Sequence, residues 1–322
     1  MRAVVVTTPG GPDVMEVVDR PTPEPGPGEV LVDVAAGGVN FIDTYHRSGA
    51  YPLPAPFVVG SEGAGRVVAT GTGVRDVRVG DRVAWAMVPG TGYAEQAVVP
   101  ADRLVPVPDD VDDETAAAVL LQGMTAQFLT RSTFPVSAGD DVLVHAAAGG
   151  VGLLLTQMAS AAGARVIGTT STQDKAALAR EAGAAEIVPA DADLAAEVRR
   201  ITGGRGVDVV YDGVGRATFD AGLDCLRPRG MMVLFGAASG PVPPLDPQVL
   251  NAKGSLFLTR PSLVHYTAER AELLERAGDV LELVRTGRLA VRIGGRYRLA
   301  EARRAHEDLE GRRTTGKLLV LP

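Results

Sequence analysis

The sequence predicts an α/β protein in which a doubly wound parallel sheet of six strands is joined to a second, β-rich domain. Two observations carry this prediction. Six apolar runs alternate with helical patterns between residues 124 and 264, which is typical of a parallel sheet with helical crossovers. Short β-branched runs broken by Gly and Pro fill residues 1–123, which indicates a small antiparallel, barrel-like domain.

The first region contains five predicted strands. They are AVVV at 3–6, EVLVDVAA at 29–36, GRVVAT at 65–70, DRVAWAMV at 81–88 and YAEQAVV at 93–99. The Pro/Gly-rich stretch at 21–29 is expected to form a loop between two of them. Asp112, Asp113 and Glu114 precede an apolar run. Because acidic side chains favour a helix N-terminus, we expect a helix there that leads into the second region.

The second region contains the six strands of a Rossmann fold. They are VLVH at 142–145, RVIGTT at 165–170, EIV at 186–188, VDVVYD at 207–212, MMVLFG at 231–236 and SLFLT at 255–259. After His265 the chain shows a long helical pattern, a short strand, a second helix and the strand KLLVLP. With six parallel strands already assigned, this tail is expected to complete the first domain. The predicted domains are therefore 1–123 with 265–322, and 124–264.

The composition argues against several kinds of partner and site. A formal net charge of -7 and a pI near 5.2 argue against a nucleic acid or an anionic membrane as the main partner, because such partners select for a basic surface. Cys225 is the single cysteine, so no intramolecular disulfide or thiolate zinc cluster can form. No apolar run approaches the ~20 residues of a membrane span, and we expect a cytoplasmic protein.

The stretch DVLVHAAAGGVG at 141–152 predicts a dinucleotide-binding turn between a strand and a helix. Gly149 and Gly152 hold the second and third positions of the glycine motif, and Ala147 replaces the first. Gly149 lets the backbone approach a pyrophosphate, and Gly152 permits close packing of the helix. The pyrophosphate is expected to rest on the helix N-terminus. The alternative, a tight strand-to-helix connection without a ligand, is disfavoured by the strands on both sides.

The end of the next strand favours NADPH over NADH. NAD enzymes carry Asp or Glu there for the ribose hydroxyls, whereas residues 168–175 read GTTSTQDK. The hydroxyls of Thr170 and Ser171 and the ammonium of Lys175 suit a 2′-phosphate. Lysine is scarce in this chain, occurring only at Lys175, Lys253 and Lys317, which favours the phosphate role over a solvated helix face.

Several segments together resemble the medium-chain dehydrogenase/reductase superfamily. They are GVNFID at 38–43, GSEGAG at 60–65, VGDRV at 79–83, the glycine turn, and the stretch from Ala305 to Lys317. FIDTYHRSG at 41–49, VVYDGVGRATFDAGLDCL at 209–226 and LTRPSL at 258–263 are similar to bacterial NADPH:quinone oxidoreductases of the zeta-crystallin group. The resemblance spans essentially the whole chain. It implies a GroES-like catalytic domain split around the NADPH-binding domain, and a homodimer formed near Leu256.

The resemblance also implies that no catalytic zinc is bound. Zinc-dependent relatives carry Cys where this chain has Asn40 and His where it has Ser61. Without a Lewis acid, alkoxide stabilisation in alcohol oxidation is lost, whereas an electrophilic quinone or enone needs little beyond a well-placed hydride donor. None of the four histidines is spaced with a cysteine or carboxylate as metal ligands are, and we assign no imidazole catalyst.

By resemblance, Asn40 and Tyr45 are the predicted catalytic residues, and Tyr45 is the candidate to hydrogen-bond the acceptor oxygen. The predicted cofactor-binding residues are Asn40, Phe41, Tyr45, Thr125, Gly149, Gly150, Val151, Gly152, Thr170, Ser171, Lys175, Phe235, Gly236, Ser239, Leu258, Thr259 and Arg313. Taken singly, each has a structural alternative: Asn40 as a cap, Tyr45 as a core-edge aromatic, Phe235 as a strand residue. Relatives often carry a Tyr after the third strand, near the adenosine phosphate, where this chain has Pro189 and Ala190, so we expect the grip on that phosphate to be weaker or differently made.

The predicted reaction is hydride transfer from NADPH to a quinone or similar conjugated acceptor in an interdomain cleft. One alternative is an NADPH-dependent enone or enoyl-thioester reductase, which must protonate a carbon and so needs a positioned donor. Another is a non-catalytic, crystallin-like NADPH-binding or RNA-binding protein. The residues leave open the physiological acceptor, the choice between one- and two-electron transfer, and the proton donor.

Overall fold

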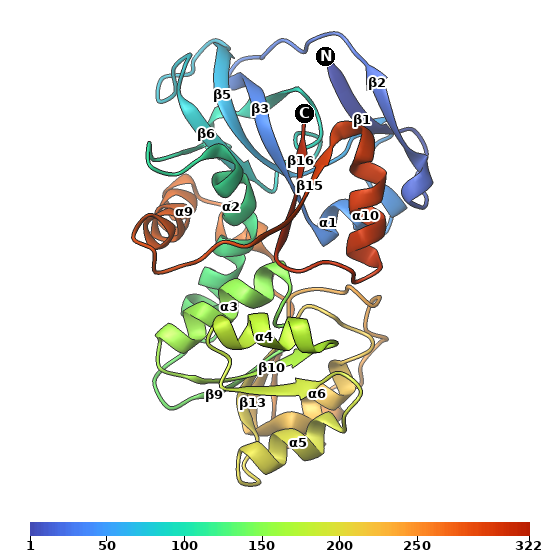
Figure 1. Cartoon of the computed structure of the whole chain (residues 1–322), viewed down its shortest axis with the longest axis vertical. Coiled ribbons are helices and arrows are strands. Elements are labelled where there is room, and N and C mark those ends of the chain that lie inside the picture. The colour runs from blue at the N-terminus through green and yellow to red at the C-terminus, as the bar shows by residue number, and fades with distance from the viewer. The chain divides into compact units, whose positions relative to one another are not determined.

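The computed structural model describes all 322 residues and divides into two compact units (Figure 1). The first unit comprises Met1–Met124 and Thr267–Pro322, and the second comprises Thr125–Tyr266. No helix combines the length and the apolar character that crossing a membrane requires.

The first unit contains two sheets. The smaller has the antiparallel order β2 (Met15–Asp19), β1 (Arg2–Val6), β4 (Phe57–Val58). The larger has the order β15 (Ile293–Arg298), β16 (Lys317–Leu321), β3 (Glu29–Val39), β5 (Glu62–Thr70), β6 (Arg82–Ala86), β8 (Val105–Pro106), and β7 (Gln96–Pro100) also pairs with β3. All pairs are antiparallel except β15 with β16. The β-rich domain is thus confirmed, with one parallel pair that was not expected.

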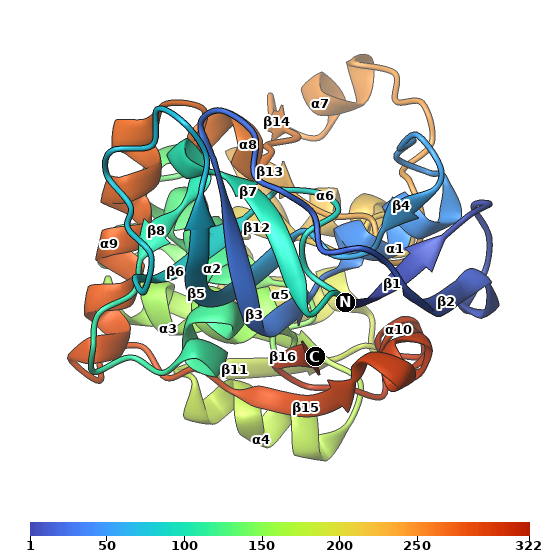
Figure 2. The same ribbon diagram turned by 90° about the horizontal axis from the view of Figure 1, so that it is seen from above.

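Helices surround these sheets (Figure 2). They are α1 (Phe41–Ser48), α2 (Asp113–Phe128), α9 (Arg270–Arg285) and α10 (Ala302–Glu310), with short 3-10 turns at Pro12–Val14, Ala101–Arg103 and Leu299–Glu301. The helix α1 was not predicted. It begins after Asn40, whose backbone N–H donates to the Asp43 carboxylate at 2.9 Å, and this Asn-x-x-Asp spacing is a helix-start signal.

The second unit is a six-stranded parallel sheet, as predicted. Its order is β11 (Glu186–Pro189), β10 (Arg165–Thr170), β9 (Asp141–Val144), β12 (Val207–Asp212), β13 (Leu226–Leu234), β14 (Phe257–Thr259). Its helices are α3 (Gly150–Ala161), α4 (Gln173–Glu181), α5 (Leu194–Ile201), α6 (Phe219–Cys225), α7 (Gln248–Ala252), α8 (Leu263–Tyr266) and a π-helical turn at Leu129–Thr133.

The strand order of this sheet locates its ligand-binding edge. The central strands β9 and β12 are buried along their whole length, as expected when helices cover both faces. The strands β10 and β11 follow β9 on one side of it, and β12, β13 and β14 lie on the other side. Ligands of such sheets bind at the carboxyl ends of the strands where the order reverses, and the glycine turn lies directly after β9.

Candidate functional site

The glycine turn opens the helix α3. Gly149 is the residue before its first turn, and no side chain caps the helix, so its first N–H groups are free for a ligand. A Cβ on Gly152 would lie 2.3 Å from the Ala146 carbonyl oxygen, so only glycine permits this packing of helix on strand. A Cβ on Gly149 would lie 3.1 Å from the same oxygen. An uncapped helix start beside partly exposed glycine backbone fits a pyrophosphate.

The alanine in place of the first motif glycine has a structural explanation. Ala147 is fully buried, and a Cβ on Gly168 of β10 would lie 2.8 Å from the Ala147 methyl group. The missing side chain of Gly168 therefore makes room for the methyl group of Ala147. The preceding Ala146 has a φ of 50°, in the left-handed region that an alanine rarely adopts.

The end of β10 carries no carboxylate. Thr170 is buried and Ser171 is exposed. Thr172 caps α4 by accepting from the Lys175 backbone N–H at 3.3 Å, which places Lys175 in the first turn. Ala190 donates its backbone N–H to the Thr170 carbonyl at 2.9 Å, so the position where relatives carry a Tyr lies beside the same strand end.

Two further loops of the second unit are rigidly held. Asp212 is fully buried and accepts from the backbone N–H groups of Val214 at 2.7 Å and Gly215 at 2.9 Å. The Ser239 hydroxyl donates to the Val214 carbonyl at 2.8 Å and accepts from Ala217 N–H at 3.0 Å. Because both functions of this hydroxyl are used inside the protein, Ser239 joins the loops after β12 and β13.

The parallel sheet brings most predicted cofactor residues to its carboxyl edge. They follow or end four strands: residues 149–152 after β9, Thr170 and Ser171 at β10, Phe235 and Gly236 after β13, and Leu258 and Thr259 in β14. Thr125 lies apart, 8% exposed within α2. Arg313 belongs to the first unit, is 61% exposed at its side chain and forms an ion pair with Asp308 at 2.8 Å.

In the first unit, α1 carries an aromatic group. Phe41 and Tyr45 are one helical turn apart, with ring centroids separated by 6.4 Å. Tyr51, which was not predicted, lies 5.2 Å from Tyr45 between centroids and is 43% exposed. Three partly exposed rings suit a planar, conjugated ligand, because offset and edge contacts between rings are favourable.

Asn40 lies at the start of α1 in a buried polar network. Its Nδ2 donates to Glu62 Oε2 at 2.9 Å and to the Gly38 carbonyl at 3.3 Å, and Lys317 Nζ donates to its Oδ1 at 2.8 Å. Lys317 and Glu62 form an ion pair at 2.5 Å with side chains 1% and 0% exposed. Glu62 Oε1 also accepts from Leu121 N–H at 2.6 Å.

Neither Glu62 nor Lys317 was predicted as a site residue. The sequence held a signal for Lys317. Lys317 begins the otherwise apolar strand KLLVL, where a buried ammonium requires an anionic partner. A Cβ on Gly38 would lie 2.3 Å from Glu62 Oε2, so the glycine of the GVN segment is the space into which that carboxylate fits.

Asp43 connects Asn40 with Ser61. Its carboxylate accepts from the Asn40 backbone N–H and from the Ser61 hydroxyl, each at 2.9 Å. Burial raises the pKa of Asp43 to about 7, against the opposing effect of these hydrogen bonds. The two positions where zinc-dependent relatives carry Cys and His are thus engaged with carboxylates of this chain. No group of three or more His, Cys, Asp or Glu side chains is arranged to hold a metal ion.

His306 carries a buried imidazole that contacts Arg47 and Tyr93. Arg47 Nη1 lies 3.2 Å from His306 Nδ1, and because a guanidinium only donates, the imidazole proton is on Nε2, 3.1 Å from Tyr93 Oη. Burial, and then the Asp43 charge, raise the pKa of the Tyr93 hydroxyl. Burial, and then the Arg47 charge, lower the pKa of His306 to about 3. This histidine is neutral and structural.

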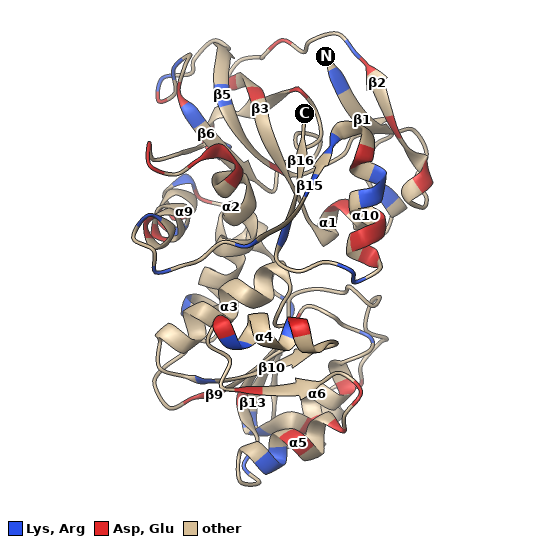
Figure 3. Ribbon diagram, viewed as in Figure 1, with Lys and Arg blue, Asp and Glu red and all other residues tan.

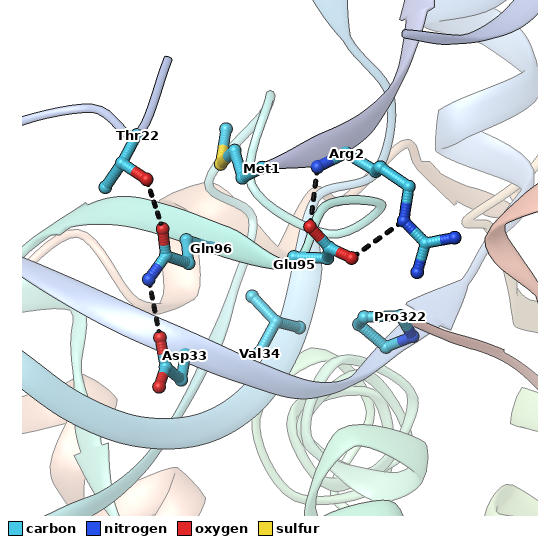
Figure 4. A pocket seen from close by; sticks show the side chains of 8 residues that line it. All are labelled: Met1, Arg2, Thr22, Asp33, Val34, Glu95, Gln96 and Pro322. Atoms are coloured by element: carbon cyan, nitrogen blue, oxygen red, sulfur yellow. Dashed lines mark hydrogen bonds and ion pairs between the residues drawn. The ribbon is translucent and has the colours of Figure 1, made fainter. Parts of the chain in front are cut away.

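One hollow of the first unit, about 500 Å³ in volume, lies away from these residues (Figure 4). Its polar side chains bind one another: Arg2 pairs with Glu95 at 2.8 Å, and Gln96 bridges Thr22 and Asp33, each at 2.8 Å. Acidic and basic residues are interspersed on helices such as α5 and α10 (Figure 3). Neither feature provides a better candidate than the two sites above.

Comparison with known proteins decides the family. An alcohol dehydrogenase GroES-like domain model matches residues 26–109, and a zinc-binding dehydrogenase model matches residues 150–279. A quinone oxidoreductase of Pseudomonas aeruginosa is 47% identical over 97% of both chains. The chain belongs to the quinone oxidoreductase family.

This family is a branch of the medium-chain dehydrogenase/reductase superfamily, as its sequence motifs indicated. Another member, a 2-haloacrylate reductase of a Burkholderia species, is 44% identical over 99% of this chain and 98% of that protein. The solved structure of the Escherichia coli quinone oxidoreductase complexed with NADPH matches all of both chains, with 41% identity and a TM-score of 0.97.

Proposed function

We propose that the protein is a zinc-independent NADPH:quinone oxidoreductase that reduces a quinone or a related conjugated carbonyl compound. The observation that carries the proposal is the pairing of an uncapped glycine turn after β9 with a carboxylate-free end of β10 followed by Lys175. The names of the relatives and the NADPH in the Escherichia coli structure support it. The bound cofactor supplies the hydride, and the protein supplies placement and exclusion of water.

The two units have separate tasks in this proposal. In the second unit, the N–H groups at Gly150–Gly152 bind the pyrophosphate, and Lys175 with Thr170 and Ser171 binds the 2′-phosphate. Phe235, Gly236, Leu258 and Thr259 flank the nicotinamide, and Thr125 binds its ribose. The Arg313 guanidinium already donates to Asp308, so Arg313 can contribute to phosphate binding only with its remaining N–H groups.

In the first unit, Phe41, Tyr45 and Tyr51 receive the planar acceptor, and the Tyr45 hydroxyl donates to its oxygen. Asn40 acts indirectly. Its amide and backbone N–H are bound to Glu62, Lys317 and Asp43, so it fixes the start of α1 and does not itself bind the acceptor.

Zinc independence rests on Asn40 and Ser61. An amide and a hydroxyl are weak ligands beside the Cys and His of zinc sites. In this chain both are also hydrogen-bonded to carboxylates. Dialysis against a chelator is expected to leave turnover unchanged, and activity that returns only on addition of zinc contradicts this part of the proposal.

A second candidate is reduction of an activated carbon–carbon double bond, which the 44% identical 2-haloacrylate reductase favours. That reaction protonates a carbon and so depends on a positioned donor, for which Tyr45 is the candidate. A Tyr45→Phe variant that loses activity on enones or enoyl thioesters but retains quinone turnover supports this secondary activity.

We also propose a cytoplasmic homodimer. The edge strand β14 exposes Phe257 at 57% and Leu258 at 37%, and an open apolar strand edge favours pairing with an identical edge. Sedimentation of the purified protein is expected to give a dimer, and Phe257→Lys is expected to give a monomer. The single, buried Cys225 is consistent with a reducing compartment.

The experiment that tests the main proposal is an acceptor panel with NADPH. It compares ortho- and para-quinones with enones and enoyl thioesters at equal concentration. We expect the highest kcat/KM with a quinone. A higher kcat/KM with enoyl thioesters replaces the main proposal with the second candidate, and no turnover of any acceptor contradicts both.

A further inference from the structure

The polar network around Asn40 leaves one buried atom without a partner. The network consists of Asn40, Glu62, Gln122 and Lys317, all within the first unit. Its donors and acceptors bind one another or nearby backbone, with a single exception. Gln122 Oε1 is buried and accepts no hydrogen bond in the structure.

The orientation of this amide follows from the charged end of the network. An ammonium only donates, so the Asn40 atom 2.8 Å from Lys317 Nζ is the carbonyl oxygen. A carboxylate only accepts, so the Asn40 atom 2.9 Å from Glu62 Oε2 is the nitrogen. Asn40 Oδ1 therefore faces Gln122, whose Nε2 donates to it at 3.4 Å. Turning the Gln122 amide over would bring two carbonyl oxygens together.

The buried ion pair of Lys317 and Glu62 thus fixes the orientation of the Asn40 amide, and Asn40 in turn fixes Gln122 Oε1 as a hydrogen-bond acceptor. A buried carbonyl oxygen without a donor is unfavourable, and such groups are uncommon in native proteins unless a water molecule, a ligand or an ion satisfies them. The other end of the network begins α1, which carries Phe41 and Tyr45. The free acceptor accordingly belongs to the part of the first unit where the proposed acceptor molecule binds.

We propose that Gln122 is a ligand-binding residue whose Oε1 accepts a hydrogen bond from an N–H or O–H group of the ligand. This inference rests on the proposed function. A quinone carries only acceptor oxygens and cannot supply that bond. Two groups of the reaction can: the carboxamide N–H of the nicotinamide and the hydroxyl of the reduced, hydroquinone product. The shared chemistry is a neutral donor presented to a fixed amide oxygen.

The cofactor arm of the test uses an analogue without the donor. Reduced 3-acetylpyridine adenine dinucleotide phosphate has a methyl ketone in place of the carboxamide. Dissociation constants for NADPH and this analogue are measured by fluorescence titration on the wild type and Gln122→Met. If the carboxamide is the donor, the variant raises the dissociation constant of NADPH by about threefold to tenfold, the range of one neutral hydrogen bond. The dissociation constant of the analogue is unchanged.

The acceptor arm uses product inhibition. Inhibition constants are measured for a hydroquinone and for its dimethyl ether, which lacks both hydroxyl donors. If the hydroquinone is the donor, Gln122→Met raises the inhibition constant of the hydroquinone by about threefold to tenfold and leaves that of the ether unchanged. A change confined to one arm identifies the source of the donor.

Two variants control the test. Gln122→Glu is isosteric and, when protonated, keeps both an O–H toward Asn40 and a carbonyl acceptor, so it should restore the lost binding at acidic pH. Thr156→Val removes another buried polar atom without a partner, in α3 of the second unit, and should alter neither arm. The melting temperature of Gln122→Met without ligand should equal or exceed that of the wild type, because an unsatisfied acceptor is removed.

The inference is overturned if Gln122→Met folds, reduces quinones and keeps two wild-type ratios. These are the ratio of the dissociation constants of NADPH and its analogue, and the ratio of the inhibition constants of the hydroquinone and its ether. It is also overturned if all four ligands weaken equally, since that indicates a general loss of structure. Wild-type protein that binds no NADPH and reduces no quinone contradicts the proposed function instead, so the two failures are distinguishable.

Discussion

Each of the two units contains buried acidic side chains that are paired with basic ones. The two groups differ in how far their basic partners are exposed to solvent. In the second unit, Asp141 and Asp208 stand near the amino ends of β9 and β12 and bind Arg165, Arg205 and Arg227 at 2.5 to 2.9 Å. These arginine side chains are 29% to 46% exposed. In the first unit, Glu62 and Lys317 are sealed from solvent.

The contrast separates a structural cluster from the one that we propose to be functional. The aspartate cluster lies at the edge of the sheet opposite the glycine turn, and hydrogen bonds from Arg205 and Arg227 outweigh burial and lower the pKa of Asp208 to about 2. The Asn40 network adjoins Asp43, whose pKa burial raises to about 7, and it leaves Gln122 Oε1 unpaired. A carboxyl group whose pKa is raised by burial is a candidate for a functional site, whereas structural ion-pair networks such as the aspartate cluster also perturb pKa values.

The largest expected effect is on the sealed pair. Lys317→Met leaves the Glu62 carboxylate buried and unpaired, which should lower the free energy of unfolding by about 3 to 5 kcal/mol. Urea denaturation measures the change. Adding Glu62→Gln, which keeps an acceptor for Leu121 N–H, should recover part of the loss. Equal stability of wild type and Lys317→Met contradicts the burial of this pair.

The next effect is the pH dependence caused by Asp43. Its folded pKa of about 7 lies above the ordinary 3.8, so the folded state holds a proton that the unfolded state releases. This contribution is complete below pH 4 and is lost as the pH rises through 7, amounting to about 4 kcal/mol at most. Asp43→Asn should remove this slope from unfolding curves recorded between pH 4 and 8. An unchanged slope shows that Asp43 does not titrate there.

The aspartate cluster should show the opposite sign. The folded pKa of Asp208 lies below the ordinary 3.8, at about 2. Its contribution is present above pH 4 and is lost as the pH falls through 2. We expect Asp208→Asn to lower the free energy of unfolding at neutral pH by about 2 kcal/mol, with no effect on the NADPH dissociation constant. Weakened NADPH binding contradicts the structural assignment.

The smallest expected effect on the free energy of unfolding is that of Arg165, a partly exposed member of the aspartate cluster. Arg165 is 44% exposed at its side chain and binds Asp141, which Arg205 also binds. Arg165→Gln should therefore change the free energy of unfolding by less than about 1 kcal/mol. A loss as large as that of Lys317→Met removes the distinction between the two groups.

The parallel sheet could be read from the sequence because its signals are local. Each strand is an apolar run, each crossover has helical spacing, and the glycine turn has a fixed place between them. The helix α1 was missed because FIDTYHRS is short and mixed in polarity, and its start depends on the Asn40 to Asp43 contact. The parallel pairing of β15 with β16 depends on chain segments whose register no local pattern sets.

The site was predictable to a similar degree. Glycines and the absent carboxylate after β10 indicate a cofactor through residue type and spacing alone. The pair of Glu62 and Lys317 is separated by 255 residues, so only the fold reveals that each lies against Asn40. The same holds for the engaged Ser239 hydroxyl and the Arg313 ion pair, since a sequence does not show that a predicted ligand already has a protein partner.

The most direct test of the central claim is the coenzyme preference of the purified protein with one para-quinone. We predict that kcat/KM with NADPH exceeds that with NADH at least tenfold, and that Lys175→Ala raises the KM for NADPH while leaving NADH turnover unchanged. Equal use of NADH and NADPH by the wild type, or an unchanged KM for NADPH in the Lys175→Ala variant, would contradict the assignment.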